Sequence, residues 1–234
     1  MDEKNLSLRL ERVANYVRKN DRLADIGSDH AYLPSALVLN GTIEYAIAGE
    51  VVDGPYQSAK SHVSALGIEH KIDVRFGNGL DVVESKDNIT AISICGMGGS
   101  LIASILDKGF EDGKLSGNER LLLQPNVGEY TLRKWLVEHN YNVVGEDLLE
   151  ENHKMYEIMI AEKSNQPVEA TESDLQYGFL LKNTPTPMFR KKWQVELKKN
   201  KYIQASLEQS KSDQTEKLKT VKETIQQIEE LLKK

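Results

Sequence analysis

The stretch that decides the fold is Leu23-Ala24-Asp25-Ile26-Gly27-Ser28-Asp29-His30-Ala31-Tyr32-Leu33-Pro34. Its pattern predicts an apolar strand, a turn at Gly27 and then a helix. A glycine in this turn lets the backbone approach a ligand closely, and the free N–H groups of the helix favour a polar or anionic ligand group. The stretch therefore indicates a cofactor site, with the alternative that Asp29 only caps the helix.

This turn differs from the fingerprint of dinucleotide-binding proteins. In Gly-x-Gly-x-x-Gly the second glycine would fall at Asp29, and an acidic side chain there would repel a pyrophosphate. A ligand with an ammonium group fits better, and the methionine part of S-adenosylmethionine is one example. Asp29 would then face the ammonium group, while His30 and the N–H groups of the turn would face the carboxylate.

Further ligand-binding signals follow the next predicted strands. Glu50 ends an apolar strand at 44–50. In a βαβ unit, an acidic residue about 20 residues after the glycine turn is placed to bind the ribose hydroxyls, and Glu50 follows Gly27 at close to that spacing. Gly77-Asn78-Gly79-Leu80 follows a strand at 72–76 and predicts an Asn-Gly turn near an adenine. A strand at 91–95 opens into a predicted glycine loop, Gly96-Met97-Gly98-Gly99, which permits close backbone approach.

The rest of the first part of the chain alternates between strand and helix patterns. This order predicts an α/β fold with a doubly wound, mostly parallel sheet and an antiparallel edge. The polar turns would then meet along the carboxyl edge of the sheet, where such folds bind ligands. The predicted helices are 5–19, one ending near 40, 55–66, 101–106 and one ending at 139; the further strands are 120–123, which leads into Gln124-Pro125-Asn126, and 142–150 and 155–161.

The character of the sequence changes after residue 163. A polar linker leads to a short predicted helix at 174–181, and beyond Pro187 apolar residues recur at helical spacing without glycine or proline. Two helices meeting near 210–213, with Ser212 or Asp213 as a cap, would form a coiled-coil hairpin, whereas one long helix would need a partner chain. The predicted domains are 1–163, 164–187 and 188–234.

Composition narrows the class of protein. Of the 234 residues, 39% are hydrophobic and 28% charged, which suits a globular core. The single cysteine, Cys95, excludes an intrachain disulfide and a multi-cysteine zinc site and indicates a reducing compartment. No run has the pattern of a signal peptide or a membrane span. We expect a cytoplasmic protein without metal, a monomer or a weak homo-oligomer.

The net charge of -6 is unevenly distributed. Residues 164–234 contain 13 Lys and Arg against 10 Asp and Glu, while the rest of the chain contains 17 against 26. A basic appendage on an acidic body suits a polyanion, although a solvated helix face is the alternative. The RNA-binding candidates are Arg9, Arg190, Lys191, Lys192, Lys198 and Lys199.

Several motifs together resemble the bacterial family of tRNA adenine N1-methyltransferases that act on adenine 22. They are Ser7-Leu8-Arg9-Leu10, the string from Asp25 to Pro34, Ala48-Gly49-Glu50, Gly77-Asn78-Gly79-Leu80, Ile94-Cys95-Gly96-Met97-Gly98-Gly99 and Leu123-Gln124-Pro125-Asn126. The resemblance covers essentially the whole chain. It implies a class I methyltransferase fold of Rossmann-like type, S-adenosylmethionine as methyl donor, tRNA as substrate and a C-terminal helical hairpin.

The resemblance also implies roles for individual residues. The turn from Asp25 to His30 would bind the methionine part of the donor, Glu50 the ribose, and Asn78 with Gly79 the adenine. Cys95-Gly96 stands where many amino-methylating relatives carry an acidic or amide motif followed by prolines, so an obvious catalytic Asp is missing. The cofactor-binding candidates are Asp25, Gly27, Asp29, His30, Glu50, Val51, Asn78, Gly79, Cys95 and Gly96.

The chemistry suggests which groups handle the target base. Adenine N1 is already nucleophilic at neutral pH, so methyl transfer needs mainly positioning of a base taken out of its stack. The catalytic candidates are Asn126, Gln124 and His30: Asn126 would hold the base edge, unless it only caps a helix, and His30 or Asp29 would organise the donor. Two other functions stay open, an NAD-dependent oxidoreductase and a non-catalytic or self-associating binding protein.

Overall fold

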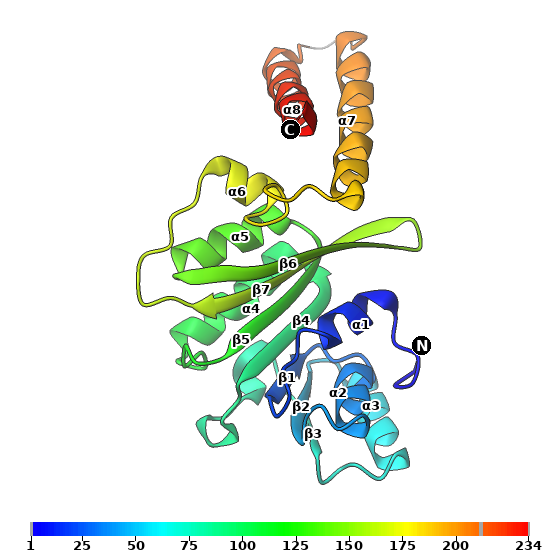
Figure 1. Cartoon of the computed structure of the whole chain (residues 1–234). Coiled ribbons are helices and arrows are strands. Elements are labelled where there is room, and N and C mark those ends of the chain that lie inside the picture. Colours follow the sequence, from blue (N-terminus) through cyan, green and yellow to red (C-terminus); the bar gives the residue numbers. More distant parts are fainter. Residues whose placement is uncertain (1, 211–212, 234) are drawn as a thin grey trace. The chain divides into compact units, whose positions relative to one another are not determined.

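The computed structural model of the chain describes residues 2–210 and 213–233. The chain forms two compact units, Met1–Phe179 and Leu180–Lys234. The first unit is built on seven strands, and the second contains two long helices (Figure 1). The strands are β1 (Arg22–Ile26), β2 (Tyr45–Glu50), β3 (Ile72–Phe76), β4 (Ala91–Gly98), β5 (Arg120–Val127), β6 (Tyr141–Glu151) and β7 (Lys154–Lys163).

All seven strands form one sheet in the order β3-β2-β1-β4-β5-β7-β6. Strands β1 to β5 pair in parallel, whereas β7 pairs antiparallel with both β5 and β6. The strand order moves outward from β1 in both directions, so the carboxyl ends of β1 and β4 meet where the winding reverses. The predicted doubly wound sheet with an antiparallel edge is confirmed, and its reversal point is where such folds bind ligands.

Helices cover both faces of this sheet because its central strands are apolar on both faces. In Leu121-Leu122-Leu123 successive side chains point to opposite sides, and all three are fully buried. One hydrophobic core joins the sheet to α1, α2 and α3, and the other joins it to α4 and α5. The helices of the first unit are α1 (Leu8–Ala14), α2 (Tyr32–Leu39), α3 (Asp53–Ala65), α4 (Gly99–Glu111), α5 (Glu129–Glu138) and α6 (Glu172–Tyr177), with short 3-10 turns η1 (Gly79–Val82) and η2 (Ser85–Asp87).

Several predicted boundaries were wrong. The opening helix covers 8–14 rather than 5–19, because Ser7 caps it by accepting a hydrogen bond from the Leu10 N–H, and it stops at Asn15. The Asn-Gly turn is the beginning of η1. The short helix predicted at 174–181 lies at 172–177, where Thr171 and Asp174 form a capping box and Gly178 ends it.

The second unit pairs α7 (Pro187–Glu208) with α8 (Thr215–Lys233). The Arg190 guanidinium donates to the Leu232 carbonyl near one end of the pair, and Lys222 contacts Glu208 near the other, so the helices run antiparallel. The alternative of one long helix was wrong. Asp213 accepts hydrogen bonds from Thr215 just before α8, while Ser212 lies outside the described residues.

Candidate active site

A pocket of about 320 Å³ opens at the carboxyl ends of β1, β2 and β4. It combines three acidic side chains with one cationic side chain, and its remaining walls are mostly apolar or glycine backbone. Such a mixed lining suits a small ligand that carries charges of both signs. The lining residues are Arg9, Leu10, Asp25, Gly27, Ser28, Asp29, Leu33, Glu50, Pro55, Cys95, Gly96 and Met97.

The turn after β1 is held against the end of β2. The N–H groups of Gly27 and Ser28 both donate to the Gly49 carbonyl, at 2.9 and 3.3 Å. Gly27 has a φ of +70°, and a Cβ at this position would overlap the Cε methyl group of Met97. The positive φ favours glycine here, whereas the Met97 methyl group ends a flexible side chain that can move aside.

The next three residues adopt an unusual backbone conformation. Asp29, His30 and Ala31 have φ values of +40°, +65° and +57°, which non-glycine residues seldom adopt and which cluster at functional sites. This conformation directs the Asp29 N–H to the Glu50 carboxylate, with N and Oε1 2.7 Å apart. The alternative of Asp29 as a helix cap was wrong, because Ala31 occupies the N-cap position of α2 and no side chain caps that helix.

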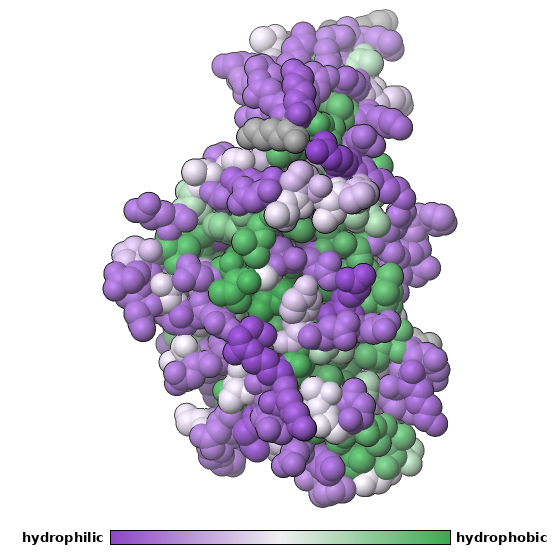
Figure 2. Space-filling model, in the orientation of Figure 1, coloured by the Kyte–Doolittle hydropathy of each residue, from purple (hydrophilic) through white to green (hydrophobic). Residues whose placement is uncertain are grey.

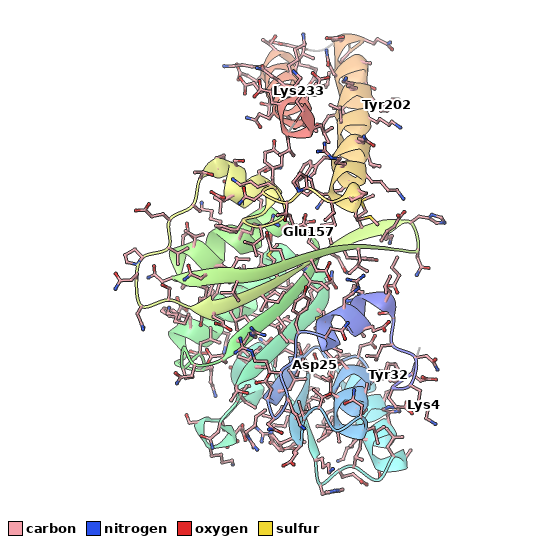
Figure 3. All side chains as sticks on the ribbon, in the orientation of Figure 1. Lys4, Asp25, Tyr32, Glu157, Tyr202 and Lys233 are labelled. Atoms are coloured by element: carbon pink, nitrogen blue, oxygen red, sulfur yellow. The ribbon has the colours of Figure 1, made fainter. Side chains whose placement is uncertain are left out.

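Asp25 lines the pocket from β1 and is 4% exposed. Its two carboxylate oxygens accept hydrogen bonds from the hydroxyls of Ser28 and Ser93, at 2.5 and 2.6 Å. Burial nevertheless raises the pKa of the Asp25 carboxyl, because few solvent molecules reach its charge. Figure 3 shows Asp25 on β1, enclosed by neighbouring elements, with Tyr32 on the adjacent helix α2.

Glu50 closes the opposite side of the pocket from the end of β2. It is 6% exposed, and burial raises the pKa of its carboxyl while the hydrogen bond from the Asp29 N–H lowers it. This residue lies at the position predicted from its spacing after Gly27.

Strands β4 and β5 continue beyond their predicted ends. The segment predicted as a glycine loop pairs with β5 up to Gly98, with register shifts around Met97, and α4 begins at Gly99. The extension places the backbone of Cys95 and Gly96 on the pocket wall. Burial raises the pKa of the Cys95 thiol, so this thiol stays protonated at neutral pH.

Gln124 on β5 is completely buried and links this wall to α1. Its Oε1 accepts hydrogen bonds from Arg9 Nη1 at 2.5 Å and from the Gly96 N–H at 3.0 Å. Its Nε2 donates to the Pro125 carbonyl at 2.6 Å and faces Asn126 Oδ1 at 3.4 Å. Gln124 therefore uses its amide on protein partners, and it does not line the pocket.

Asn126 lies two residues further along β5 and is exposed. Its Nδ2 donates to the Gly96 carbonyl at 2.6 Å, which leaves the second N–H of Nδ2 and a lone pair of Oδ1 for another partner. The alternative of Asn126 as a helix cap was wrong, because β5 extends to Val127 and Gly128 is the N-cap residue of α5.

Four other predicted cofactor residues are not among the residues that line the pocket. The His30 side chain is 43% exposed, stacks on the Tyr32 ring and lies 3.6 Å from Asp29. Val51 is exposed just after Glu50. Asn78 is exposed before η1, and Gly79 faces Ile105 on α4.

The predicted RNA-binding residues fall into two groups. Arg9 lines the pocket of the first unit, whereas the other five lie on α7. Of these, Arg190 donates to the Leu232 carbonyl, the Lys192 ammonium lies over the Trp193 ring, and Lys199 pairs with Glu196. Lys191 and Lys198 have exposed side chains. Figure 2 shows a largely hydrophilic surface over α7 and α8.

Sequence reasoning missed the supports behind the pocket. Ser93 holds Asp25, and Gln124 holds Arg9, across separations of 68 and 115 residues. A sequence pattern over a few tens of residues cannot predict contacts between residues so far apart in the chain. Glu50, in contrast, could be predicted because it follows Gly27 at the spacing of one βαβ unit.

Among the residues that the structure describes, no three or more His, Cys, Asp or Glu side chains gather in a way that would hold a metal ion. No helix in residues 2–210 and 213–233 is both long and apolar enough to span a membrane.

Comparison with known proteins identifies the family. The model of the family described as tRNA (adenine(22)-N(1))-methyltransferase matches residues 23–230. The tRNA (adenine(22)-N(1))-methyltransferase of Bacillus subtilis is 40% identical over 238 residues, which cover 99% of each chain.

Solved structures agree with this match. An uncharacterised protein of Listeria monocytogenes superposes with a TM-score of 0.93 at 44% identity, over 97% of this chain and all of that one. A putative tRNA (m1A22) methyltransferase of Streptococcus pneumoniae, in complex with S-adenosyl-L-methionine, superposes with a TM-score of 0.88 at 44% identity and the same coverage. The chain described here therefore belongs to the tRNA (adenine(22)-N(1))-methyltransferase family.

Proposed function

We propose that this chain transfers the methyl group of S-adenosylmethionine to N1 of adenine 22 in tRNA. The observation that carries the proposal is the acidic pocket between Gly27 and Glu50, in a chain of this family. The activity named for its relatives suggests the reaction, and the side chains that line the pocket suit the methyl donor. We expect the protein to act in the cytoplasm, where tRNA is modified.

The residues of the pocket fit the charges of this donor. S-adenosylmethionine carries a sulfonium, an ammonium and a carboxylate, and its ribose offers two hydroxyl groups. Asp25, Asp29 and Glu50 supply negative charge for the cationic groups. Arg9 supplies the positive charge among these lining residues.

Each acidic residue has a distinct proposed task. Glu50, fixed by the Asp29 N–H, accepts hydrogen bonds from the ribose hydroxyls. Asp29 faces the ammonium group with its exposed carboxylate. Asp25 holds the shape of the turn through Ser28 and Ser93. Val51, Asn78 and Gly79 then border the adenosine from the ends of β2 and β3.

The end of β5 supports the proposed handling of the target base. When bound, the donor supplies an electrophilic methyl group. Asn126 is fixed to the Gly96 carbonyl beside the pocket, and its Oδ1 has a lone pair with which to accept a hydrogen bond from the exocyclic amine of adenine. That contact turns N1 towards the pocket and assists loss of the amine proton after N1 gains the methyl group. Gln124 acts through Asn126 as a positioning residue, and His30 borders the site beside Asp29.

Helix α7 provides the proposed contact with the tRNA backbone. The exposed Lys191 and Lys198 suit phosphate groups, because binding a polyanion releases its counterions. Arg190, Lys192 and Lys199 add positive charge on the same helix. The coiled-coil packing of α7 on α8 remains a prediction.

The test is transfer of labelled methyl from S-adenosylmethionine to unmodified tRNA, followed by nucleoside analysis of the digest. We expect 1-methyladenosine, and its loss when adenine 22 is replaced by guanine. Donor binding without methyl transfer to any tRNA would favour a non-catalytic binding protein. An oxidoreductase is disfavoured because three acidic side chains surround the space in which a pyrophosphate would lie.

A further inference from the structure

Tyr202 on α7 is the most exposed large hydrophobic side chain that the structure describes (Figure 3). It is 76% exposed, and Val195, two turns nearer the beginning of the same helix, is 50% exposed. The lysines at 191 and 198 on this helix are exposed as well. Aromatic rings presented among basic side chains are typical of surfaces that bind the bases of single-stranded nucleic acids.

These four exposed side chains form one stripe along α7. Lys191, Val195, Lys198 and Tyr202 follow one another at the alternating intervals of four and three residues that keep side chains on one face of an α-helix. Less exposed side chains repeat the same intervals, shifted by two residues. Each residue turns the helix by about 100°, so this shift of two places the stripe on the side opposite the less exposed face. The side chains of that opposite face are Trp193, Leu197, Asn200 and Gln204.

Positive charge in the second unit is concentrated on α7. This helix contains six Lys and Arg residues and two Glu, whereas α8 contains four Lys and four Glu. The stripe itself combines two lysines with two apolar side chains, so its charge suits a polyanion. A second copy of the chain laid on the same face would bring lysines against lysines, and this repulsion disfavours self-association through the stripe.

We propose that this stripe binds an unpaired base of tRNA, with the base stacked on the Tyr202 ring and the neighbouring phosphates beside Lys191 and Lys198. The inference rests on the proposed function for the identity of the RNA. An aromatic ring stacks on a base whose face is uncovered, whereas the bases inside a double helix are covered by their neighbours. Stacking therefore selects a loop or a single-stranded segment, while lysines alone bind any phosphate backbone.

The test measures the affinity of the full chain for RNA by fluorescence anisotropy, at several salt concentrations and without methyl donor. The probes are unmodified tRNA, a single-stranded RNA oligonucleotide and the fully paired duplex of the same sequence. In Tyr202→Ala we expect the Kd for tRNA and for the single strand to rise by about 5- to 100-fold, the effect of losing one base stack. The affinity for the duplex and the salt dependence stay as in the wild type, because no lysine is removed.

Tyr202→Phe is the matched control, because phenylalanine keeps the ring and removes only the hydroxyl. This variant should bind all three RNAs as the wild type does. Lys198→Glu should give the complementary result, a lower affinity for all three RNAs and a smaller salt dependence. A second unit that failed to fold would also lose duplex binding, so the expected pattern separates loss of the ring from loss of the helix pair.

Several results would overturn the inference. Tyr202→Ala would then bind the single strand as tightly as the wild type, or lose single strand and duplex equally, or be matched in its loss by Tyr202→Phe. A wild-type dimer in sedimentation that Tyr202→Ala dissociates, with RNA binding unchanged, would instead assign the stripe to a second copy. The binding assay needs no methyl transfer, so absence of 1-methyladenosine would refute the proposed function while these affinities still decide the role of Tyr202.

Discussion

Replacing Gln124 with methionine tests whether this buried amide holds the end of the sheet together. Methionine has nearly the same length and volume, so the change removes polar contacts without opening a large cavity. The Gly96 N–H loses its acceptor, the Pro125 carbonyl loses a donor, and Arg9 loses its anchor. The Gly96 and Arg9 hydrogen bonds are only partly buried, so the three lost hydrogen bonds cost about 1 kcal/mol each. We expect the free energy of unfolding to fall by about 2–4 kcal/mol.

Urea denaturation measures this loss. The chain has two tryptophans, Trp135 in the first unit and Trp193 in the second, so a Trp193→Phe background lets Trp135 fluorescence report on the first unit alone. Gln57→Met is the matched control, because Gln57 is exposed on α3, and its effect should stay within about 0.5 kcal/mol. A Gln124→Met variant as stable as this control would refute the view that the Gln124 amide stabilises the fold.

Three further predictions concern the donor, the buried carboxyl and tRNA. Glu50→Gln weakens S-adenosylmethionine binding by about 10- to 100-fold, because an amide replaces a charged acceptor of the ribose hydroxyls; unchanged affinity by calorimetry would exclude Glu50 from the site. Burial raises the pKa of Asp25, so the wild type loses stability as the pH rises from about 4 through that raised pKa, and Asp25→Asn does not. The free energies of unfolding of the two proteins should therefore diverge in favour of the variant as the pH rises from about 4 through the raised pKa of Asp25, and parallel curves would contradict this. Lys198→Glu raises the KM for tRNA and lowers the salt dependence of tRNA binding by about one unit of slope in a log–log plot, whereas the control Lys86→Glu on η2 does neither.

Family and fold were predictable because their signals are local. The run from Leu23 to Gly27 forms a buried strand and a tight turn through its own apolar and glycine residues, and Glu50 follows at a spacing set by one βαβ unit. The family match over residues 23–230 confirms the resemblance that these motifs carry. The alternation of strands and helices likewise predicts a doubly wound, mostly parallel sheet with an antiparallel edge, whereas the strand order comes from the structure.

Boundaries at glycine and proline were harder to predict. Gly96 and Gly98 indicated a loop and Pro125 a strand end, yet β4 and β5 continue to Gly98 and Val127 because they pair with each other. A neighbouring strand supplies hydrogen bonds that local propensity does not represent. The register shifts around Met97 accommodate the irregular backbone.

The sequence by itself determined the α/β alternation, the turn at Gly27, the acid at Glu50 and the family to which the chain belongs. Only the tertiary structure decided which side chains share the pocket. Arg9 is an RNA-binding candidate in the sequence, and folding places its guanidinium beside Gln124 and Gly96 in the lining of the pocket. The physical reason is that backbone conformation is governed mainly by near neighbours, whereas the position of a long charged side chain is set by partners that the packing of distant elements brings within hydrogen-bond distance.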